Sequence, residues 1–466
     1  MFSCFVRKST YSSTFLGIKM LKLLFLELNH DIDWAVAAVG PAYIAANLKQ
    51  YGHSTTLLQV PQDMNSSHLA DSIKEVSPDI IGLSLTSRQW LRAKKLVPEI
   101  KKELDIPIIA GGLLPTFSSE EVLNTEGFDY VCIGEGEQAM LELVNAIENN
   151  AYPIKNIRNI RGRGEPMPEL RLPFEPIDDI PFMARDMLGE QYGVRHISTQ
   201  RGCPFPCTYC AAQQISHLYP GGYQSYGRRR SVDNVLQELL QIQNESELNY
   251  IVFLDDTFTI NHKWVEEFCF KYKKAFSIPF SINARAETVN EKILAQLSGA
   301  GCMHIIYGVE SGSEQLRQNV LQRNVSNEHL INTFSWTRNS GMIVTANYML
   351  GIPGETRENV EETLSLHKFL KPDDFGYFVF YPFPGTAMFS LCKNKGYLPK
   401  DYYDIPVNHR ESILNLPDLT KDDIKYYYQC FTELRIANKS EAMPHNLDKK
   451  TQQSISEQIQ TFANQG

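Results

Sequence analysis

One stretch of the chain indicates both its fold and its chemistry: Arg201-Gly202-Cys203-Pro204-Phe205-Pro206-Cys207-Thr208-Tyr209-Cys210. Its three cysteines follow a Cys-x3-Cys-x2-Cys spacing, and the prolines on both sides of Phe205 stiffen the loop and disfavour a helix. Thiolates are the usual ligands of iron–sulfur clusters, and a cubane cluster ordinarily takes four of them. A loop with three cysteines therefore leaves one iron with an open coordination site that chemistry can use.

Zinc is the alternative metal for the same thiols, with His217 as a possible fourth ligand. Structural zinc sites usually combine a Cys-x2-Cys pair with a second pair of ligands, and this loop is unusual for them. Both metals accept thiolates. The spacing favours a cluster on Cys203, Cys207 and Cys210. It leaves a zinc- or cluster-containing binding module without catalysis as an alternative of another class.

Length and composition restrict the class of protein further. A chain of 466 residues predicts two or three domains, and 43% hydrophobic with 21% charged residues is typical of a soluble globular protein. The net charge of −9 disfavours nucleic acid as a partner. No apolar run reaches the roughly 18 residues of a membrane span. Six of the nine cysteines are scattered, which disfavours a secreted disulfide framework and predicts a cytoplasmic protein.

Residues 20–150 alternate apolar strands with amphipathic helices, a pattern typical of a parallel sheet. The runs IIGLSL at 80–85 and PIIAGG at 107–112 are apolar on both faces, as strands covered by helices on both faces require. This segment therefore predicts an α/β, doubly wound, Rossmann-like domain. The expected strands are 21–28, 55–60, 80–85, 106–110 and 130–133.

The remainder of the chain is expected to form a linker, a second α/β domain and a tail. Residues 151–190 lack a sustained period and predict the linker, and six strand–helix units within 191–385 predict a barrel or an open part of one. The expected strands are 194–199, 250–254, 280–284, 304–309, 344–350 and 377–381. Residues 386–466 predict a small helical extension whose last residues fray. Residues 1–19 are expected to be a disordered leader or the product of an upstream start codon.

The Cys-x3-Cys-x2-Cys loop, with aromatic Tyr209 before its last cysteine, resembles the signature of radical S-adenosylmethionine (SAM) enzymes. In that superfamily the open iron of a [4Fe–4S] cluster binds SAM, and an electron cleaves SAM to a 5′-deoxyadenosyl radical. The resemblance implies a partial (β/α)6 barrel of TIM type, with chemistry at the C-terminal ends of its strands. It also implies SAM-binding roles for four residues that end successive strands: Asp255, Arg285, Glu310 and Gly351.

The first domain resembles the cobalamin-binding domains that precede such barrels. The resemblance implies that Ser84, Gly111, Gly112 and Gly134, at the ends of strands, line the slot for the nucleotide tail. No G-x-G-x-x-G follows the first strand, which disfavours NAD. The Asp-x-His-x-x-Gly motif of His-ligated cobalamin proteins is also absent, and His30 is expected to be a solvated loop residue. A domain that has lost cobalamin remains the alternative.

The resemblance implies two possible reactions. The first is cobalamin-dependent methylation of an unactivated carbon of a small-molecule or natural-product substrate. The second is cyclisation, oxidation or rearrangement without methyl transfer. A transfer RNA methylthiotransferase would need cysteines in its first domain, where only Cys132 occurs, and a basic tail. The chemistry implies an electron donor such as flavodoxin or ferredoxin.

Two further segments have a functional and a structural interpretation. The run Arg228–Arg230 matches a segment common in the family, and a solvated turn before a helix is its alternative. The aromatic residues of 377–383 line an apolar substrate pocket or belong to the core, and alternating strand residues more often belong to the core. No catalytic residue is assigned from the sequence.

Overall fold

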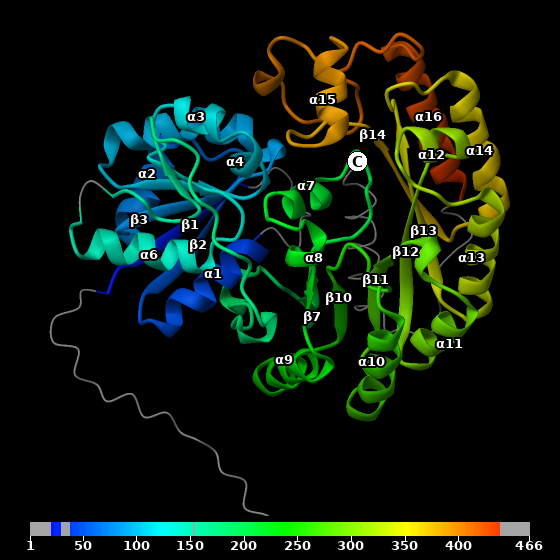
Figure 1. The fold of residues 1–466 in the computed structure, drawn as a ribbon, viewed down its shortest axis with the longest axis horizontal. Helices are drawn as coiled ribbons and strands as arrows, with labels where there is room; N and C mark the ends of the chain where they lie inside the picture. Colours follow the sequence, from blue (N-terminus) through cyan, green and yellow to red (C-terminus); the bar gives the residue numbers. More distant parts are fainter. Residues whose placement is uncertain (1–19, 29–37, 152–153, 439–466) are drawn as a thin grey trace, which may run out of the picture.

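The computed structural model describes residues 20–28, 38–151 and 154–438. These residues form two α/β units, each built on a six-stranded sheet, and the first unit lies to one side of the second (Figure 1). Both expected sheets are present, so the α/β prediction for both parts of the chain is confirmed. His30 and residues 1–19 and 439–466 lie outside the described residues.

The sheet of the first unit has the strand order β2-β1-β3-β4-β5-β6, in which the first five strands are parallel. Its strands are β1 (Lys22–Leu28), β2 (Ser54–Val60), β3 (Ile80–Ser84), β4 (Ile108–Gly111), β5 (Tyr130–Cys132) and β6 (Ile160–Gly162). The helices are α1 (Val39–Gln50), α2 (Ser66–Val76), α3 (Ser87–Glu103), α4 (Leu113–Phe117), α5 (Ser119–Asn124) and α6 (Glu137–Glu148).

The first sheet is covered on both faces because successive residues of its strands point to opposite sides. Leu23 and Phe25 of β1 pack into one apolar cluster with α1 and α6, whereas Leu24 and Leu26 pack into a second cluster with α2 and α3. Both faces are thus apolar and both are buried. This arrangement is the doubly wound, Rossmann-like architecture that the sequence predicts.

Strand β6 is a departure from the sequence prediction, because it lies in the segment expected to be an extended linker. It pairs antiparallel with β5, and Val131 is opposite Arg161. Arg161 donates to Ser119 Oγ at 2.8 Å and to Glu120 Oε1 at 2.5 Å, so its charge is paired at the sheet edge. Three residues are too few to show the alternation by which a strand is recognised.

The second unit is an open barrel. Its parallel sheet has the order β14-β13-β12-β11-β10-β7, so the first and last strands are its two edges. The strands are β7 (Val194–Ile197), β10 (Tyr250–Phe253), β11 (Phe280–Ala284), β12 (Cys302–Glu310), β13 (Ile343–Leu350) and β14 (Asp374–Val379). The main outer helices are α9 (Val232–Glu245), α10 (His262–Ala275), α11 (Glu291–Gly299), α13 (Asn327–Asn339) and α14 (Arg357–Leu370). A six-stranded partial (β/α) barrel is therefore confirmed.

The C-terminal part covers one edge of this barrel and returns to the first unit. Helix α16 (Lys421–Asn438) packs on β14, where the rings of Tyr377 and Phe431 are 5.5 Å apart. The segment after α15 (Ala387–Asn394) reaches the first unit, where Tyr403 Oη and Ser118 Oγ lie 2.9 Å apart (Figure 1). The extension is thus part of the packed structure up to Asn438.

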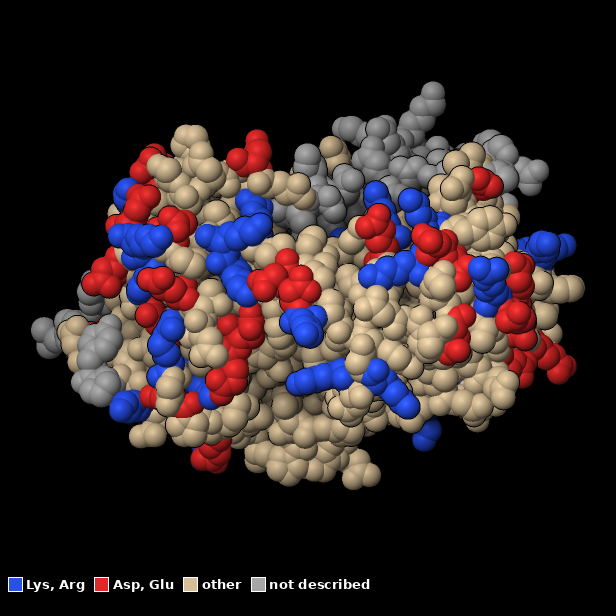
Figure 2. Space-filling view, turned by 90° about the horizontal axis from the view of Figure 1, so that it is seen from above, with Lys and Arg blue, Asp and Glu red and all other residues tan. Residues whose placement is uncertain are grey.

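The surface carries charges of both signs. Basic and acidic side chains are interspersed over the upper face of the molecule, where the first unit and the C-terminal ends of the barrel strands meet (Figure 2). Within the described ranges, no helix combines the length and the apolar character that crossing a bilayer requires.

Candidate active site

The three clustered cysteines lie in the loop between β8 (Gln200–Arg201) and α7 (Ala211–His217), at the C-terminal end of β7. Gly202 begins the loop with a φ of +87°, and a Cβ atom there would lie 3.2 Å from the Gly227 backbone, so only glycine fits. Cys203 and Cys207 are buried, and Cys210 is half-buried. The loop is therefore held in one conformation beside the barrel mouth.

The donor set bears on the choice between an iron–sulfur cluster and zinc. Among the residues with described positions, no three His, Cys, Asp or Glu side chains are close enough to chelate a single ion. A zinc ion about 2.3 Å from each thiolate would require such a group. In a cubane cluster each thiolate binds a different iron, so the sulfurs are farther apart. The donor set of three thiols fits a cluster, and His217 is not grouped with them.

Arg285 connects the third barrel strand to this loop. It follows β11, its Nη1 donates to Cys207 Sγ at 2.9 Å, and its guanidinium group lies 3.9 Å from the centroid of the Phe205 ring. Glu287 accepts from Arg285 Nη2 at 2.5 Å. Burial raises the pKa of Cys210 to about 12 and also raises the pKa of Cys203, so these thiols need positive charge nearby before they ionise. Arg285 supplies one such charge.

Asp255 ends β10, but its carboxylate faces the backbone before the loop. Its Oδ1 accepts from the backbone N–H groups of Thr199 and Gln200 at 2.8 and 3.0 Å, and its Oδ2 accepts from Thr199 Oγ1 at 2.6 Å. Both oxygens are thus engaged by the protein, and the residue fixes the end of β7. The family resemblance implies a SAM-binding role for Asp255, and its neighbour Asp256 is exposed at the same rim.

Asp256 is the exposed member of the pair, although many protein atoms lie near its carboxylate. Burial among these atoms, with the nearby Asp255 charge, raises the pKa of Asp256 to about 6. Sequence reasoning singled out Asp255 of the Asp255-Asp256 pair, since the two carboxylates are indistinguishable without their contacts. In the described structure Asp255 is buried, whereas Asp256 is exposed at the rim.

Glu310 ends β12 with a φ of +69°, which is strained for a residue with a side chain. Its Oε1 accepts from Tyr209 Oη at 2.9 Å, and Arg323 Nη1 donates to Tyr209 Oη at 3.1 Å. Arg323 also donates to Gly308 O at 2.6 Å. This network ties the aromatic residue of the cysteine loop to the end of the fourth barrel strand. Arg323 was missed by sequence analysis, because it lies in a loop outside every recognised motif.

Gly351 ends β13 with a φ of +81°, and a Cβ atom there would lie 2.9 Å from Ile424 Cδ1 of α16. Its N–H donates to Glu355 Oε2 at 2.6 Å, and the N–H of Ile352 donates to the same oxygen at 3.2 Å. Burial raises the pKa of Glu355 to about 8, although these two N–H groups oppose the shift. Gly351 thus lies on the expected rim, and its contacts are with the barrel and α16 rather than with the cysteine loop.

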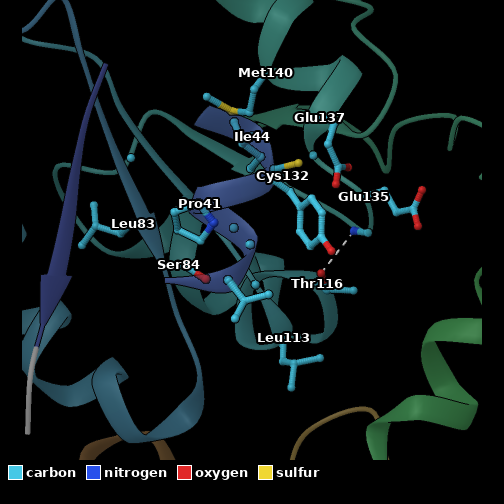
Figure 3. Close-up of a pocket in the computed structure, with 18 of the residues that line it drawn as sticks. Pro41, Ile44, Leu83, Ser84, Leu113, Thr116, Cys132, Glu135, Glu137 and Met140 are labelled. Atoms are coloured by element: carbon cyan, nitrogen blue, oxygen red, sulfur yellow. Dashed lines mark hydrogen bonds between the residues drawn. The ribbon is translucent and has the colours of Figure 1, made fainter. Parts of the chain in front are cut away.

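A cavity of about 470 Å³ opens at the C-terminal edge of the first sheet (Figure 3). The four residues predicted for cobalamin, Ser84, Gly111, Gly112 and Gly134, all lie on its wall. Gly112 has a φ of +96°, and a Cβ atom there would meet Leu85 O at 2.7 Å, so the tight backbone contact between neighbouring strand ends needs glycine. No histidine is among the described residues that line this cavity.

The second unit contributes to the same cavity through Ser198, Arg201, Ile215 and Tyr226. Glu135 and Glu137 lie on one side of it, and Thr116 Oγ1 accepts from the Gly134 N–H at 3.2 Å (Figure 3). The cavity is thus walled by both units, and Arg201 on its wall is two residues before Cys203. Sequence analysis identified Gly134 but not the neighbouring Glu135 and Glu137. It used glycines as the sign that the backbone can approach a ligand closely, and acidic side chains give no such sign.

The three consecutive arginines have three different environments. Arg228 donates to Glu135 across the domain boundary, whereas Arg230 Nη1 donates to Glu238 Oε2 at 2.6 Å within the barrel. Arg229 lies 3.9 Å from the Trp264 ring centroid, and burial lowers its pKa to about 10. A solvated turn is therefore the wrong interpretation of this run.

The aromatic residues around β14 divide between core and rim. Tyr377 packs with Phe431 and belongs to the core, and Phe380 is buried in a separate apolar cluster. The ring of Tyr381 is 5.2 Å from that of Phe383 and 5.5 Å from that of Tyr402 in the C-terminal extension. The residues of β14 thus belong to the core, as expected for alternating strand residues. Tyr381 and Phe383, which follow the strand, pack at the rim near the C-terminal extension.

Comparison with known proteins gives two family matches. The B12 binding domain matches residues 30–144, and the Radical SAM superfamily matches residues 197–367. The first match contains the cavity of the first unit, and the second contains the cysteine loop. The two matches follow each other in the order that the sequence analysis predicts.

Three curated relatives match most of this chain. An uncharacterized methyltransferase from Pyrococcus horikoshii is 28% identical over 80% of this chain and 84% of its own length. The anaerobic magnesium-protoporphyrin IX monomethyl ester cyclase of Rubrivivax gelatinosus is 25% identical over 80% of this chain and 70% of its own. The cytidylyl-2-hydroxyethylphosphonate methyltransferase of Streptomyces wedmorensis is 23% identical over 84% of both chains.

Solved structures share the fold. The cobalamin-dependent SAM radical enzyme OxsB, with aqua-cobalamin and SAM bound, has a TM-score of 0.71 at 16% identity over 96% of this chain and 72% of its own. The radical SAM methyltransferase TsrM from Kitasatospora setae, with cobalamin and a [4Fe–4S] cluster bound, has a TM-score of 0.66 at 16% identity over 81% and 75%. Both likenesses concern the fold.

The chain is a radical SAM enzyme that carries a B12 binding domain in front of its barrel. Cobalamin, a [4Fe–4S] cluster and SAM are the cofactors and the cosubstrate of this class of enzyme, which confirms the prediction made from the cysteine loop and the first domain.

Proposed function

We propose that this enzyme is a cobalamin-dependent radical SAM methyltransferase that acts on an unactivated carbon of a small molecule. One observation carries the proposal: Arg201, two residues before Cys203, is among the residues that line the cavity of the B12 binding domain. Cofactors bound at these two places would be neighbours. The methyltransferases among the relatives support methylation as the reaction.

The chain's own residues have separate tasks in this proposal. Cys203, Cys207 and Cys210 hold the cluster, and Arg285 balances the charge of the Cys207 thiolate from 2.9 Å. Asp256 and Glu310 offer carboxylates to the polar groups of SAM. When bound, the cluster supplies the electron that cleaves SAM, and cobalamin supplies the methyl group.

The cobalamin site is proposed on the fit of its wall. Gly111 and Gly112 bring the backbone close to the cavity, and a Cβ atom at Gly112 would displace the end of β3. Ser84 offers a hydroxyl group at the same edge. Ligands of open α/β sheets bind beyond the carboxyl ends of the strands, which is where this cavity lies.

A second candidate function rests on the cyclase from Rubrivivax gelatinosus, which covers as much of this chain as the first methyltransferase does. In that case the enzyme forms a ring or rearranges its substrate, and no methyl group is transferred. Both functions need the same electron donor, for which we propose a flavodoxin or a ferredoxin, and both suit a cytoplasmic enzyme.

The products of SAM distinguish the two functions without a known substrate. The chain is reconstituted anaerobically with iron, sulfide and hydroxocobalamin, then incubated with SAM and a chemical reductant. Formation of both S-adenosylhomocysteine and 5′-deoxyadenosine supports methyl transfer. Formation of 5′-deoxyadenosine alone supports the cyclase, and absence of both products contradicts both functions. The Cys207→Ala variant is the control, since it should form no 5′-deoxyadenosine.

A further inference from the structure

A two-stranded ribbon precedes the cysteine loop and carries two facing arginines. β8 pairs antiparallel with β9 (Arg228–Arg229), and in this ribbon Arg201 lies directly opposite Arg228. Like charges that face each other destabilise a pair of strands. The ribbon from which Cys203 extends therefore requires an anion between its two guanidinium groups.

That anion comes from the other domain. Glu135 Oε1 accepts from Arg201 Nη1 at 3.0 Å and also from Arg228 Nη2. Glu137 Oε1 accepts from Arg201 Nη2 at 2.5 Å. Two carboxylates thus balance two guanidinium groups across the domain boundary.

The four charged groups are largely removed from solvent. The exposed fractions of the side chains are 17% for Arg201, 4% for Arg228, 14% for Glu135 and 10% for Glu137. Removing one partner of a buried ion pair is far more costly than removing an exposed one, because the other charge is left uncompensated. The arrangement of the ribbon therefore depends on the loop that carries the two glutamates.

The same loop is a wall of the cobalamin cavity. Glu135, Glu137, Arg201 and Tyr226 all line the cavity of about 470 Å³. A molecule that fills it contacts the ion pairs directly and restricts the movement of the two glutamates. If the two glutamates move, Arg201 moves with them. Cys203 is only two residues after Arg201, so the movement also shifts the cysteine loop.

We propose that Arg201 is a positioning residue that couples occupancy of the B12 cavity to the geometry of the cluster loop. The inference rests on the proposed function, since it assumes that cobalamin and the cluster occupy these two sites. The coupling acts through Glu135 and Glu137, and it is reciprocal, because each bound cofactor must raise the affinity for the other by the same factor.

The test compares the hydroxocobalamin Kd of the cluster-loaded chain with that of the cluster-free chain, by absorbance titration. In the wild type we expect the cluster to tighten binding about fivefold or more. In Glu135→Gln the ratio of the two Kd values should fall to about one, with the iron content unchanged. A merely structural role would weaken binding in both states alike and leave the ratio as it was.

Asp404→Asn is the matched control, because Asp404 pairs with Lys94 at another contact between the B12 domain and the rest of the chain, at 2.8 Å. Its ratio should equal that of the wild type. If Glu135→Gln does not fold, Glu137→Gln removes the other partner of Arg201 and should lower the ratio as well.

Three results would overturn the coupling. A wild-type ratio of one would do so, as would an unchanged ratio in a glutamate variant that binds both iron and cobalt. A third is an equal fall of the Kd ratio in Asp404→Asn and in the glutamate variants, because any contact between the domains would then produce the effect. A wild-type chain that binds neither cobalt nor a cluster contradicts the proposed function itself, and the coupling with it.

Discussion

Gly134 of the B12 domain and Tyr219 of the radical SAM domain are in close contact: a Cβ atom on Gly134 would lie 2.6 Å from Tyr219 Oη. The Gly134 φ is +75°, so glycine is required both by the backbone and by the neighbouring ring. A residue that the sequence marks as part of a ligand slot thus also determines how closely the two domains approach.

Replacing Gly134 by alanine should therefore destabilise the contact between the domains. Gly164 is a matched control, since its φ is +74° and no atom lies within 4 Å of a Cβ there. We expect Gly164→Ala to cost about 1 kcal/mol and Gly134→Ala about 1–3 kcal/mol more, from the added clash. The midpoints of urea unfolding measure both costs. Equal midpoints for Gly134→Ala and Gly164→Ala would show that the contact with Tyr219 does not contribute to stability.

Loss of any one of Cys203, Cys207 and Cys210 should remove the cluster. Alanine at each position deletes a ligand, so iron per chain after anaerobic reconstitution should fall to a small fraction of the wild-type value. Cys269 and Cys302 are buried in the barrel core and serve as controls. Alanine at these two positions should leave the iron content unchanged, and iron loss there equal to that of Cys207→Ala would contradict the assignment.

The hydroxyl group of Tyr209 should matter for SAM binding rather than for folding. Tyr209→Phe removes the hydrogen bond to Glu310, worth about 1–1.5 kcal/mol, which corresponds to roughly tenfold weaker SAM binding if Glu310 is thereby misplaced. Titrating SAM into the reduced enzyme and recording the electron paramagnetic resonance spectrum of its cluster measures this affinity.

Tyr307→Phe is the control for this experiment. It removes a hydroxyl group from the same strand as Glu310, and that group lies 3.1 Å from Thr337 Oγ1 in the core. SAM affinity should stay at the wild-type value in this variant. Equal weakening by both substitutions would mean that strand packing, rather than the Tyr209–Glu310 contact, determines the affinity.

Glu355 should make the protein less stable as the pH rises. Burial raises its pKa to about 8 in the folded chain, above the usual value of 4.5. Its contribution is therefore fully present below about pH 4.5 and is lost as the pH rises toward about 8. The Glu355→Gln variant keeps an acceptor for the Gly351 N–H without a titrating group. Urea midpoints at pH 5.5, 7 and 8.5 should fall less steeply in the variant, and an identical slope would refute the prediction.

Local patterns of sequence were sufficient to predict the fold and to propose the ligands of the metal. The strands of the parallel sheets are apolar runs separated by helices, and Ser84 and Gly111 end two of these strands, where a parallel sheet brings their ends together. The cysteine spacing lies within ten residues of chain. These features are local, so no contact between distant residues was needed to recognise them.

The contacts between distant residues were not predictable in the same way. Asp255 and Asp256 are equivalent in sequence, and only the hydrogen bonds from Thr199 and Gln200 show that Asp255 is already engaged. The pairing of Arg201 with Glu135 joins residues of two domains, and no spacing in the chain marks it. Strand β6 was missed because three residues carry no period.

The most direct test of the central claim is a count of iron and cobalt in the chain after anaerobic reconstitution with iron, sulfide and hydroxocobalamin. The account predicts about four irons and about one cobalt per chain, with the absorption spectra of a [4Fe–4S] cluster and of cobalamin. Four irons without cobalt would contradict the cobalamin part of the account. One zinc and no iron would contradict the radical SAM chemistry of this chain altogether.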